Sequence, residues 1–374
     1  PQTPNPKPQT PERALNLSEG AGSRLIFLIK MISKNRKPID KNLTKEDLVA
    51  FAQRLQAGLY PTERAIQQLV QCSIEALQKR LIYYDVSPPV VVVGSLHGCF
   101  EDLMQIFKWA GDPPLVQYVF LGNYVDKGSH SLFVFLYLLC LKCLYPADIH
   151  LLRGAHESVS MNKIFGFFDE CLAEYASDKV YLSICQVYPY LPVIVRIDPK
   201  TDLKILCVHS GISPILDHLS TLFKIPRTPD VKIESKVKSA FSNGQQDYDS
   251  MLADILWADP NPKTGEGVLP WDFSENSFSY MFSEEKTKQF LVNNKLKLMI
   301  RGHDLVPEGI LYQHNRMIIT VFSAVNFGND PKNFGGFLMI NEHGEIEQFI
   351  LKEKIKGGPR EPKLSDDPIA DGII

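Results

Sequence analysis

The chain has 374 residues, of which 44% are hydrophobic and 22% are charged, proportions typical of a globular protein. This composition excludes a fibrous or wholly disordered protein. The 40 basic and 43 acidic residues leave a formal net charge of −3, so no global field would attract nucleic acid or an anionic membrane. The longest apolar run, residues 131–144, is shorter than the roughly 18 residues of a spanning helix. We therefore expect neither a nucleic-acid nor a membrane partner.

The cysteines do not form a disulfide framework. There are seven of them, an odd number that is sparse for this length. Cys140 and Cys143 form a single C-x-x-C within an apolar helical run, where buried structural thiols are expected rather than a metal or redox pair. The pattern favours a reducing compartment, the cytoplasm or the nucleus or both.

The two ends of the chain differ from its middle. Five prolines lie within residues 1–13, and a disordered Pro-rich tail is predicted over residues 1–20. A second disordered tail is predicted over residues 356–374, where Gly, Pro, Asp and Lys dominate. Residues 21–355 are expected to form a single domain.

Helical patterns come first within that domain, and short strands follow. Apolar residues recur at helical spacing in residues 23–33, after Thr44 and in residues 61–81. After Pro88-Pro89, short apolar strands alternate with helical stretches. The strands are predicted at residues 90–94, 118–122, 149–152, 205–208, 298–300, 317–322, 336–340 and 346–351. This order predicts an α/β protein with packed sheets and helices outside them.

Five of the predicted strands lead into short clusters of His, Asn, Asp and Gly. These clusters occupy residues 94–98, 122–128, 153–157, 208–211 and 300–304. Ligands gather at the carboxyl ends of strands in α/β sheets, and glycine permits the tight turns needed there. A single histidine after a strand is usually a hydrogen-bonded structural residue, but five successive clusters indicate one site.

The clusters resemble motifs of the metal-dependent serine/threonine protein phosphatases, most closely those of the protein phosphatase 1 catalytic subunit. G-S-L-H-G at residues 94–98 is similar to G-D-x-H-G, G-N-Y-V-D-K-G at 122–128 to G-D-x-V-D-R-G, and R-G-A-H-E at 153–157 to R-G-N-H-E. Residues 208–214, 256–260, 301–304 and 323–327 match further motifs, and the similarity covers residues 25–352. It implies a calcineurin-like metallophosphatase fold, in which two packed mixed β-sheets form a central sandwich flanked by helices.

The resemblance also implies where two divalent metals such as Mn, Fe or Zn would bind, and this chain departs from the pattern there. Ser95 replaces an aspartate, Asn123 replaces the bridging aspartate, and Ala155 replaces an asparagine ligand. A neutral amide does not offset the charge of two cations as a carboxylate does. His97, Asn123, His209 and His303 remain at ligand positions. No metal cofactor is therefore expected.

The positions implied for phosphate and proton transfer are partly retained. Lys127 stands for a phosphate-binding arginine, Arg301 is unchanged, Asn276 takes the place of a second such arginine, and Phe327 replaces a tyrosine. His156 and Asp126 match the general acid and its orienting carboxylate. Without metals, this pair would act mainly as a hydrogen bond that holds two loops together.

Three hypotheses follow from these departures. The first is a catalytically inactive homologue, a pseudophosphatase, that binds regulators or phosphoproteins. The second is a working protein serine/threonine phosphatase with an atypical or weakened metal site, for example one Zn²⁺ on His97, His209 and His303. Against it, these histidines belong to two separate metal positions in the family. The third is a degenerate chain with no ligand-related role.

The resemblance also implies a docking groove for regulatory proteins that carry a short apolar motif. The matching positions are Ile205, Leu298, Tyr312 and Ile346, whereas Gln348 and Lys297 depart from the pattern. An equally good interpretation is that these four are ordinary core residues of the closing sheets.

Overall fold

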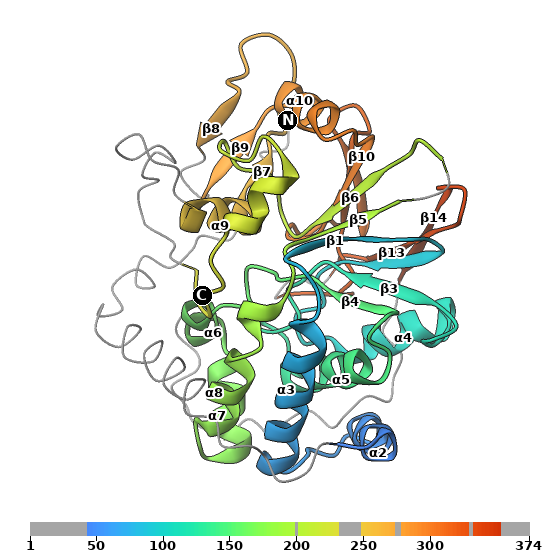
Figure 1. The fold of residues 1–374 in the computed structure, drawn as a ribbon, viewed down its shortest axis with the longest axis vertical. Helices are drawn as coiled ribbons and strands as arrows, with labels where there is room; N and C mark the ends of the chain where they lie inside the picture. The colour runs from blue at the N-terminus through green and yellow to red at the C-terminus, as the bar shows by residue number, and fades with distance from the viewer. Residues whose placement is uncertain (1–42, 199–200, 232–247, 274–277, 329–331, 353–374) are drawn as a thin grey trace.

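Two β-sheets pack face to face in the computed structural model, with helices outside them (Figure 1). The structure describes residues 43–198, 201–231, 248–273, 278–328 and 332–352. One sheet has the strand order β1 (Tyr83–Val86), β5 (Ile194–Ile197), β6 (Ile205–Val208), β10 (Leu298–Arg301), β12 (Ile318–Val321) and β11 (Ile310–Gln313). The other has the order β14 (Ile346–Leu351), β13 (Gly335–Ile340), β2 (Val90–Val93), β3 (Gln117–Phe120) and β4 (Ile149–Leu151).

Both sheets are mixed. In the five-stranded sheet, β2, β3 and β4 run parallel and β13 pairs antiparallel with β2. In the six-stranded sheet, β10 runs parallel to β6 and β12, and β1 runs parallel to β5, whereas β5 is antiparallel to β6 and β11 to β12. Alternate apolar side chains from the two sheets meet between them and form one buried cluster, because successive residues of a strand point to opposite faces. The predicted fold of two packed mixed sheets flanked by helices is confirmed.

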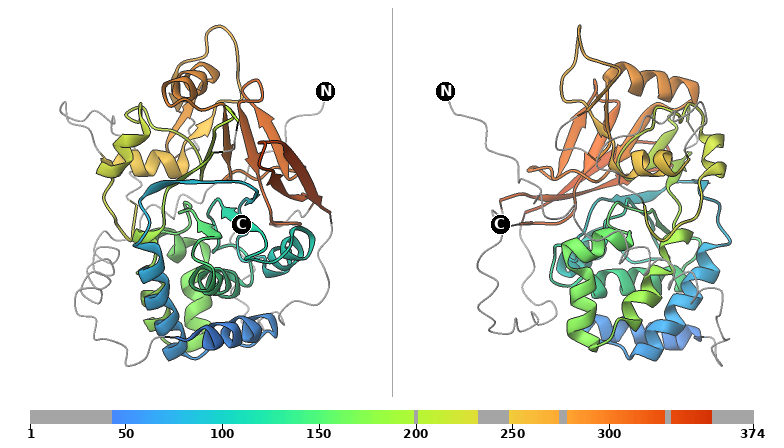
Figure 2. Two further views of the ribbon diagram at one scale, coloured as in Figure 1. Left: turned by 45° about the vertical axis from the view of Figure 1, so that its right-hand side comes forward. Right: turned by 90° about the vertical axis from the view of Figure 1, so that its left-hand side faces the viewer.

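Helices cover the outer face of each sheet (Figure 1; Figure 2). The five-stranded sheet is covered by α2 (Lys45–Gln56), α3 (Glu63–Leu77), α4 (Phe100–Ala110), α5 (Ser131–Leu144), α7 (Phe167–Tyr175) and α8 (Lys179–Cys185), with α6 (Val159–Phe165) beside them. The six-stranded sheet is covered by α9 (Tyr248–Trp257), α10 (Glu284–Asn293) and a small sheet of β7 (Asp259–Pro260), β9 (Tyr280–Phe282) and β8 (Trp271–Phe273). Helix α5 is buried along almost its whole length, which explains its apolar sequence.

The predicted elements form with small changes of boundary. Thr44 caps α2 through a capping box with Asp47, as its position in the sequence predicts. Helix α3 ends at Leu77, and Leu81 lies beyond it with 59% of its surface exposed, so the helical pattern extends one turn too far. Strands β1, β5 and β11 were not predicted. The helical pattern of residues 23–33 and both predicted tails lie outside the described residues. The predicted domain, residues 21–355, is described only in part, between residues 43 and 352.

The thiols and apolar helices behave as core. All seven cysteines are free, and the buried Cys140 thiol donates to the carbonyl oxygen of Leu48 at 3.0 Å. Cys143 lies 3.4 Å from the Ser73 hydroxyl oxygen. The structural interpretation of this C-x-x-C is therefore supported by its contacts. Among the described helices, none is both long and apolar enough to cross a membrane.

Candidate functional site

The clusters that follow the five strands meet at one end of the sandwich. The ring centroids of His97 and His156 are 4.8 Å apart, and those of His209 and His303 are 5.3 Å apart. Trp257, at the end of α9, lies between the two pairs, 5.4 Å from His303 and 6.5 Å from His156. The structure therefore brings these clusters together, and their role as one functional site stays a prediction.

The loops of this site adopt backbone conformations that side chains rarely favour. His97, Asn123, Asp126, Lys127 and His303 all have positive φ, between 44° and 70°. Such conformations persist only where surrounding structure fixes them, and they concentrate at functional sites. The loops after the strands are thus rigidly shaped despite the changes in their residue types.

His156 and Asp126 form a buried hydrogen-bonded pair. Nδ1 of His156 lies 2.8 Å from Oδ2 of Asp126, and the same carboxylate accepts from the side-chain amide of Asn162 and from the backbone N–H of Phe167, both at 2.9 Å. Burial raises the pKa of Asp126 to about 7 and holds the pKa of His156 well below its ordinary value. The pair therefore has the position and the titration range of an acid–base group near neutral pH.

The three positions that depart from the metal-binding pattern, Ser95, Asn123 and Ala155, are all buried. The Ser95 hydroxyl oxygen has no hydrogen-bond partner among the described residues. The Asn123 side-chain carbonyl accepts the backbone N–H of His156 at 3.0 Å, so this oxygen holds a loop. Ala155 packs in the apolar cluster beneath the six-stranded sheet. None of the three presents an anionic oxygen.

A single buried carboxylate, Glu157, fastens these loops. Glu157 is fully buried and accepts the backbone N–H groups of Asn123, Tyr124 and Gly154, each at 2.8 Å. Burial raises the pKa of Glu157 to about 7. Glu157 therefore ties the loop after β3 to the loop after β4 through three backbone N–H groups.

Burial favours the neutral form of the remaining histidines, His97, His209 and His303, and two of them are tied to backbone carbonyls. Burial holds the pKa of His97 and of His209 well below the ordinary value, and it also lowers that of His303. Nδ1 of His209 donates to the Leu121 carbonyl at 2.6 Å, which leaves Nε2 as an acceptor. Nδ1 of His303 lies 3.3 Å from that Nε2. His97, tied to the Val125 carbonyl at 3.2 Å, stacks on Phe327 with 4.9 Å between ring centroids.

These residues do not fit two adjacent divalent cations. Such a pair needs anionic oxygens to offset its repulsion. The former carboxylate positions hold Ser95 and Asn123, with a neutral hydroxyl and an occupied amide. His209 and His303 contact each other directly. We therefore derive no reaction step through a dinuclear metal centre.

Arg301 does not bind phosphate, and this prediction is wrong. Its side chain is fully buried. Its N–H groups donate to the carbonyl and hydroxyl oxygens of Ser210, to the carboxylates of Asp259 and Asp304, and to the hydroxyl of Thr320. These five bonds use every N–H of a guanidinium group. Arg301 ties β6, β10 and β12 together instead of reaching a substrate.

Sequence reasoning assigned no role to Asp259 and Asp304. Within the described residues, they and His303 are the one group of three side chains close enough to share a metal ion, with ligand atoms within 4.8 Å of one another. The two carboxylates already bind Arg301, at 2.6 Å and 2.8 Å. The expected absence of a metal stays a prediction, with this cluster as the first place to look.

Lys127 lies at the open side of the site. Its ammonium nitrogen is 5.1 Å from the ring centroid of Phe165 and 6.0 Å from that of Phe327. Lys127 is exposed as a residue, and partial burial of its ammonium group lowers the pKa of that group. Lys127 therefore remains available to an anion, with aromatic rings beside it. Asn276 lies outside the described residues.

The four proposed groove residues lie together but are unequally accessible. All four belong to, or pack against, the cluster between the two sheets. Ile205 is fully buried and Leu298 is 7% exposed, whereas Tyr312 and Ile346 are partly exposed on β11 and β14. The Gln348 side chain donates to the Tyr312 hydroxyl at 2.7 Å. Tyr312 and Ile346 are thus the members that a partner can touch, and Ile205 and Leu298 are core residues behind them.

The family model and one solved structure agree with the observed fold. Residues 88–307 match the family model for calcineurin-like phosphoesterases. A protein serine/threonine phosphatase from Saccharomyces cerevisiae, described as similar to human phosphatase PP5, superposes with a TM-score of 0.68 and 27% identity over 85% of this chain and 99% of that one. A cold-active protein-tyrosine phosphatase from a psychrophilic Shewanella species gives a TM-score of 0.48 and 17% identity over 73% of this chain and 84% of that one.

Proposed function

Because the chain belongs to the calcineurin-like phosphoesterase family, we propose that it is a member that recognises regulators or phosphoproteins without hydrolysing phosphate esters. The observation that carries this proposal is the hydrogen bond from the His156 backbone to the Asn123 side chain, at 3.0 Å. A bridging carboxylate in that position would bind ions, whereas the amide oxygen is committed to the protein. Metals in this fold generate the attacking hydroxide and orient the phosphate.

Loss of hydrolysis does not remove the means of recognition. Lys127 offers a positive charge at the open side of the site, although a lysine lacks the two-pronged geometry of arginine. The His156–Asp126 pair lies next to it and can donate a proton or a hydrogen bond to an anionic oxygen when protonated. A phosphorylated side chain is the ligand that these groups match by charge.

An active phosphatase with one metal ion is the second candidate. Nε2 of His209 and Nδ1 of His303 are 3.3 Å apart, a separation that two nitrogen ligands of one Zn²⁺ can have when each Zn–N bond is about 2.0–2.1 Å. In this candidate, Nδ1 of His303 would carry no proton, and it and Nε2 of His209 would both bind the ion instead of contacting each other. Asp259 lies 4.0 Å from Nε2 of His303, on the opposite edge of the ring.

One experiment separates the two candidates. The protein is purified without added metal, its Mn, Fe and Zn content is measured by elemental analysis, and its activity on an aryl phosphate is measured with Mn²⁺ supplied. We expect well under one tightly bound ion per chain and turnover orders of magnitude below that of an active family member. One stoichiometric ion that disappears in His209→Ala, together with measurable turnover, would support the active candidate instead.

We also propose that regulators with a short apolar motif dock beside β14 and β11, in line with the resemblance to protein phosphatase 1, and that the protein acts in the cytoplasm or nucleus. Tyr312 and Ile346 would contact the apolar residues of the motif. A peptide with such a motif should raise the melting temperature of the wild type but not of Tyr312→Lys. Leu311→Lys is the matched control, because Leu311 is 42% exposed on the same strand, one residue away.

A further inference from the structure

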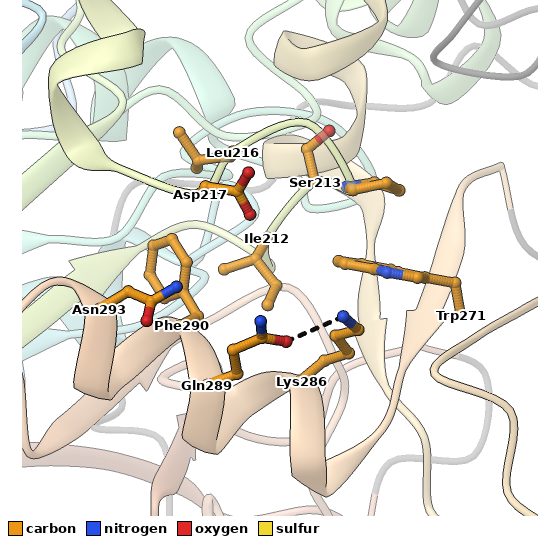
Figure 3. A pocket seen from close by; sticks show the side chains of 10 residues that line it. Ile212, Ser213, Leu216, Asp217, Trp271, Lys286, Gln289, Phe290 and Asn293 are labelled. Carbon is orange, nitrogen blue, oxygen red and sulfur yellow. Dashed lines mark hydrogen bonds between the residues drawn. The ribbon is translucent and has the colours of Figure 1, made fainter.

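A pocket lies on the outer face of the six-stranded sheet, the face turned away from the five-stranded sheet. It is lined by the loop after β6, by β8 and by α10 (Figure 3). Ile212, Leu216 and Phe290 form a buried apolar floor, and the Trp271 ring forms one wall. About 310 Å³ of non-atom space lies in and in front of the pocket, and much of that space is open solvent. The enclosed part is therefore small, and suits one side chain rather than a cofactor.

The rim carries two opposite charges on different sides. Figure 3 shows Asp217 on one side of Ile212 and Lys286 on the other. The Lys286 ammonium group donates to the Gln289 side chain at 2.9 Å. Neither Asp217 nor Lys286 has an ion-pair partner among the described residues. The charges are therefore free to meet a ligand that carries both signs around an apolar group.

Hydrogen bonds fix the walls of the pocket relative to one another. The Asn294 side chain accepts the backbone N–H of Leu219 at 2.9 Å and donates to the Asp217 carbonyl at 2.9 Å, which clamps the loop to the end of α10. The Ser283 N–H donates to the Pro270 carbonyl at 3.1 Å, which fixes the approach to Trp271. A pocket held in shape before binding loses less entropy when it is filled.

We propose that this pocket is a docking site for an extended peptide segment of a partner protein, with one large apolar residue in the pocket and a basic and an acidic residue on either side of it. Large apolar side chains stay exposed on the elements that line the pocket, Leu269 at 59% just before β8 and Val292 at 68% on α10. An occupant that extends beyond the pocket would cover them, which a small molecule of the pocket's size would not. This proposal is independent of catalysis and of the groove beside β14.

Short capped peptides test the proposal directly. The probes are labelled glycine-spaced peptides with Leu or Phe at the centre and charges two residues away on each side, because residues two apart in an extended chain share a face. One series carries one Lys and one Glu, a second carries two Lys, and a third carries two Glu. A Ser-centred peptide is the control for the apolar anchor. Binding is measured by fluorescence polarisation up to about 1 mM.

We expect the wild type to prefer the mixed-charge peptide by roughly two- to fivefold per matched charge. Lys286→Glu should switch the preference to the peptide with two Lys, and Asp217→Lys should switch it to the peptide with two Glu. Lys288→Glu makes the same charge change at an exposed position of α10 that does not line the pocket, and should keep the wild-type preference. A switch of preference cannot result from partial unfolding.

Three results would overturn the proposal. The Ser-centred peptide could bind as well as the Leu-centred one, which would remove the apolar anchor. Lys288→Glu could shift the preference as far as Lys286→Glu does, which would reduce the effect to net surface charge. Free leucine could compete at the same concentration as the peptide, which would make the pocket a small-molecule site.

Discussion

The two halves of the candidate site differ in how many of the family's motif residues they keep. On the proton-transfer side, His156, Asp126 and Asn162 form a connected network with every bond at 2.7–2.9 Å. On the metal side, Ser95, Asn123 and Ala155 present no anionic oxygen, and His209 and His303 contact each other. The proton-transfer half thus keeps a connected network of hydrogen bonds, whereas the metal half keeps its histidines without carboxylates at Ser95 and Asn123 that could offset the charge of two cations.

The difference between the two halves is tested most strongly by returning the three changed positions of the metal side to the family's ligand residues. Ser95→Asp, Asn123→Asp and Ala155→Asn together should allow metal binding, measured by elemental analysis, and raise turnover of an aryl phosphate by orders of magnitude. Turnover should stay below that of an active relative, because Lys127 handles phosphate less well than arginine. Unchanged metal content in a folded triple variant would contradict the importance of these three positions.

The next effect concerns the carboxylate that holds the loops of both halves. Glu157→Ala leaves three buried N–H groups without their acceptor, and each such group costs about 1–3 kcal/mol. We expect the free energy of unfolding to fall by about 3 kcal/mol or more in urea denaturation, and by less in Glu157→Gln, which keeps one oxygen. Glu308→Ala, at an exposed position, is the control. Equal losses for Glu157→Ala and Glu308→Ala would show that the loops are held otherwise.

A smaller effect separates the halves by pH. Burial raises the pKa of Asp126 from 3.8 to about 7, so between these values the folded protein binds a proton that the unfolded chain releases. This group stabilises the fold fully below its unfolded pKa, and the contribution is lost as pH rises towards 7. Relative to Asp126→Asn, the wild type should gain stability as pH falls from 7 to 5, by at most about 1.4 kcal/mol per pH unit.

The informative quantity is the difference in unfolding free energy between the wild type and Asp126→Asn, because other buried groups titrate in both proteins. The lowered pKa values of His97 and His209 act in the opposite direction, since the unfolded chain takes up protons below pH 6.5. Their contribution cancels in the difference between the two proteins. Parallel curves of unfolding free energy against pH for wild type and variant would mean that Asp126 keeps an ordinary pKa.

The smallest expected effect is that of a chelator. Bound ions stabilise a fold by mass action, and their removal lowers the melting temperature when they are part of the native state. Because Glu157 and Asn123 already hold the loops, EDTA should leave the melting temperature of the wild type unchanged and lower that of the restored triple variant loaded with metal. A drop in the wild type would point to an ion on Asp259, His303 and Asp304.

Much of the fold is predictable from the sequence because strongly apolar strands are followed by distinctive loops. The four valines of β2 and the clusters after β3, β4, β6 and β10 mark five strands of the two sheets. β1 and β5 escape prediction because a charged residue interrupts each apolar run, Asp85 in β1 and Arg196 in β5, and these two residues pair across the strands at 2.5 Å. A pairing of that kind depends on long-range register and leaves no local pattern.

The site was predicted in its members but not in all their roles. Position in a motif identified His156 and Asp126, and their contact follows from the loops that carry them. It misassigned Arg301, because a residue's position does not reveal how many acceptors surround its guanidinium group. Trp257 was present within a matched motif, yet its place between the two histidine pairs depends on how α9 packs.

The three amides bound to Glu157 have a consequence for hydrogen exchange. Loops around an active site normally open more easily than the core and exchange their amide protons sooner. Here the N–H groups of Asn123, Tyr124 and Gly154 end on one buried carboxylate. Their release requires water to enter beneath the sheets, so these amides should exchange only with the slowest cooperative unit of the protein. The loops that usually adapt to a substrate would then be among the last parts of this molecule to move.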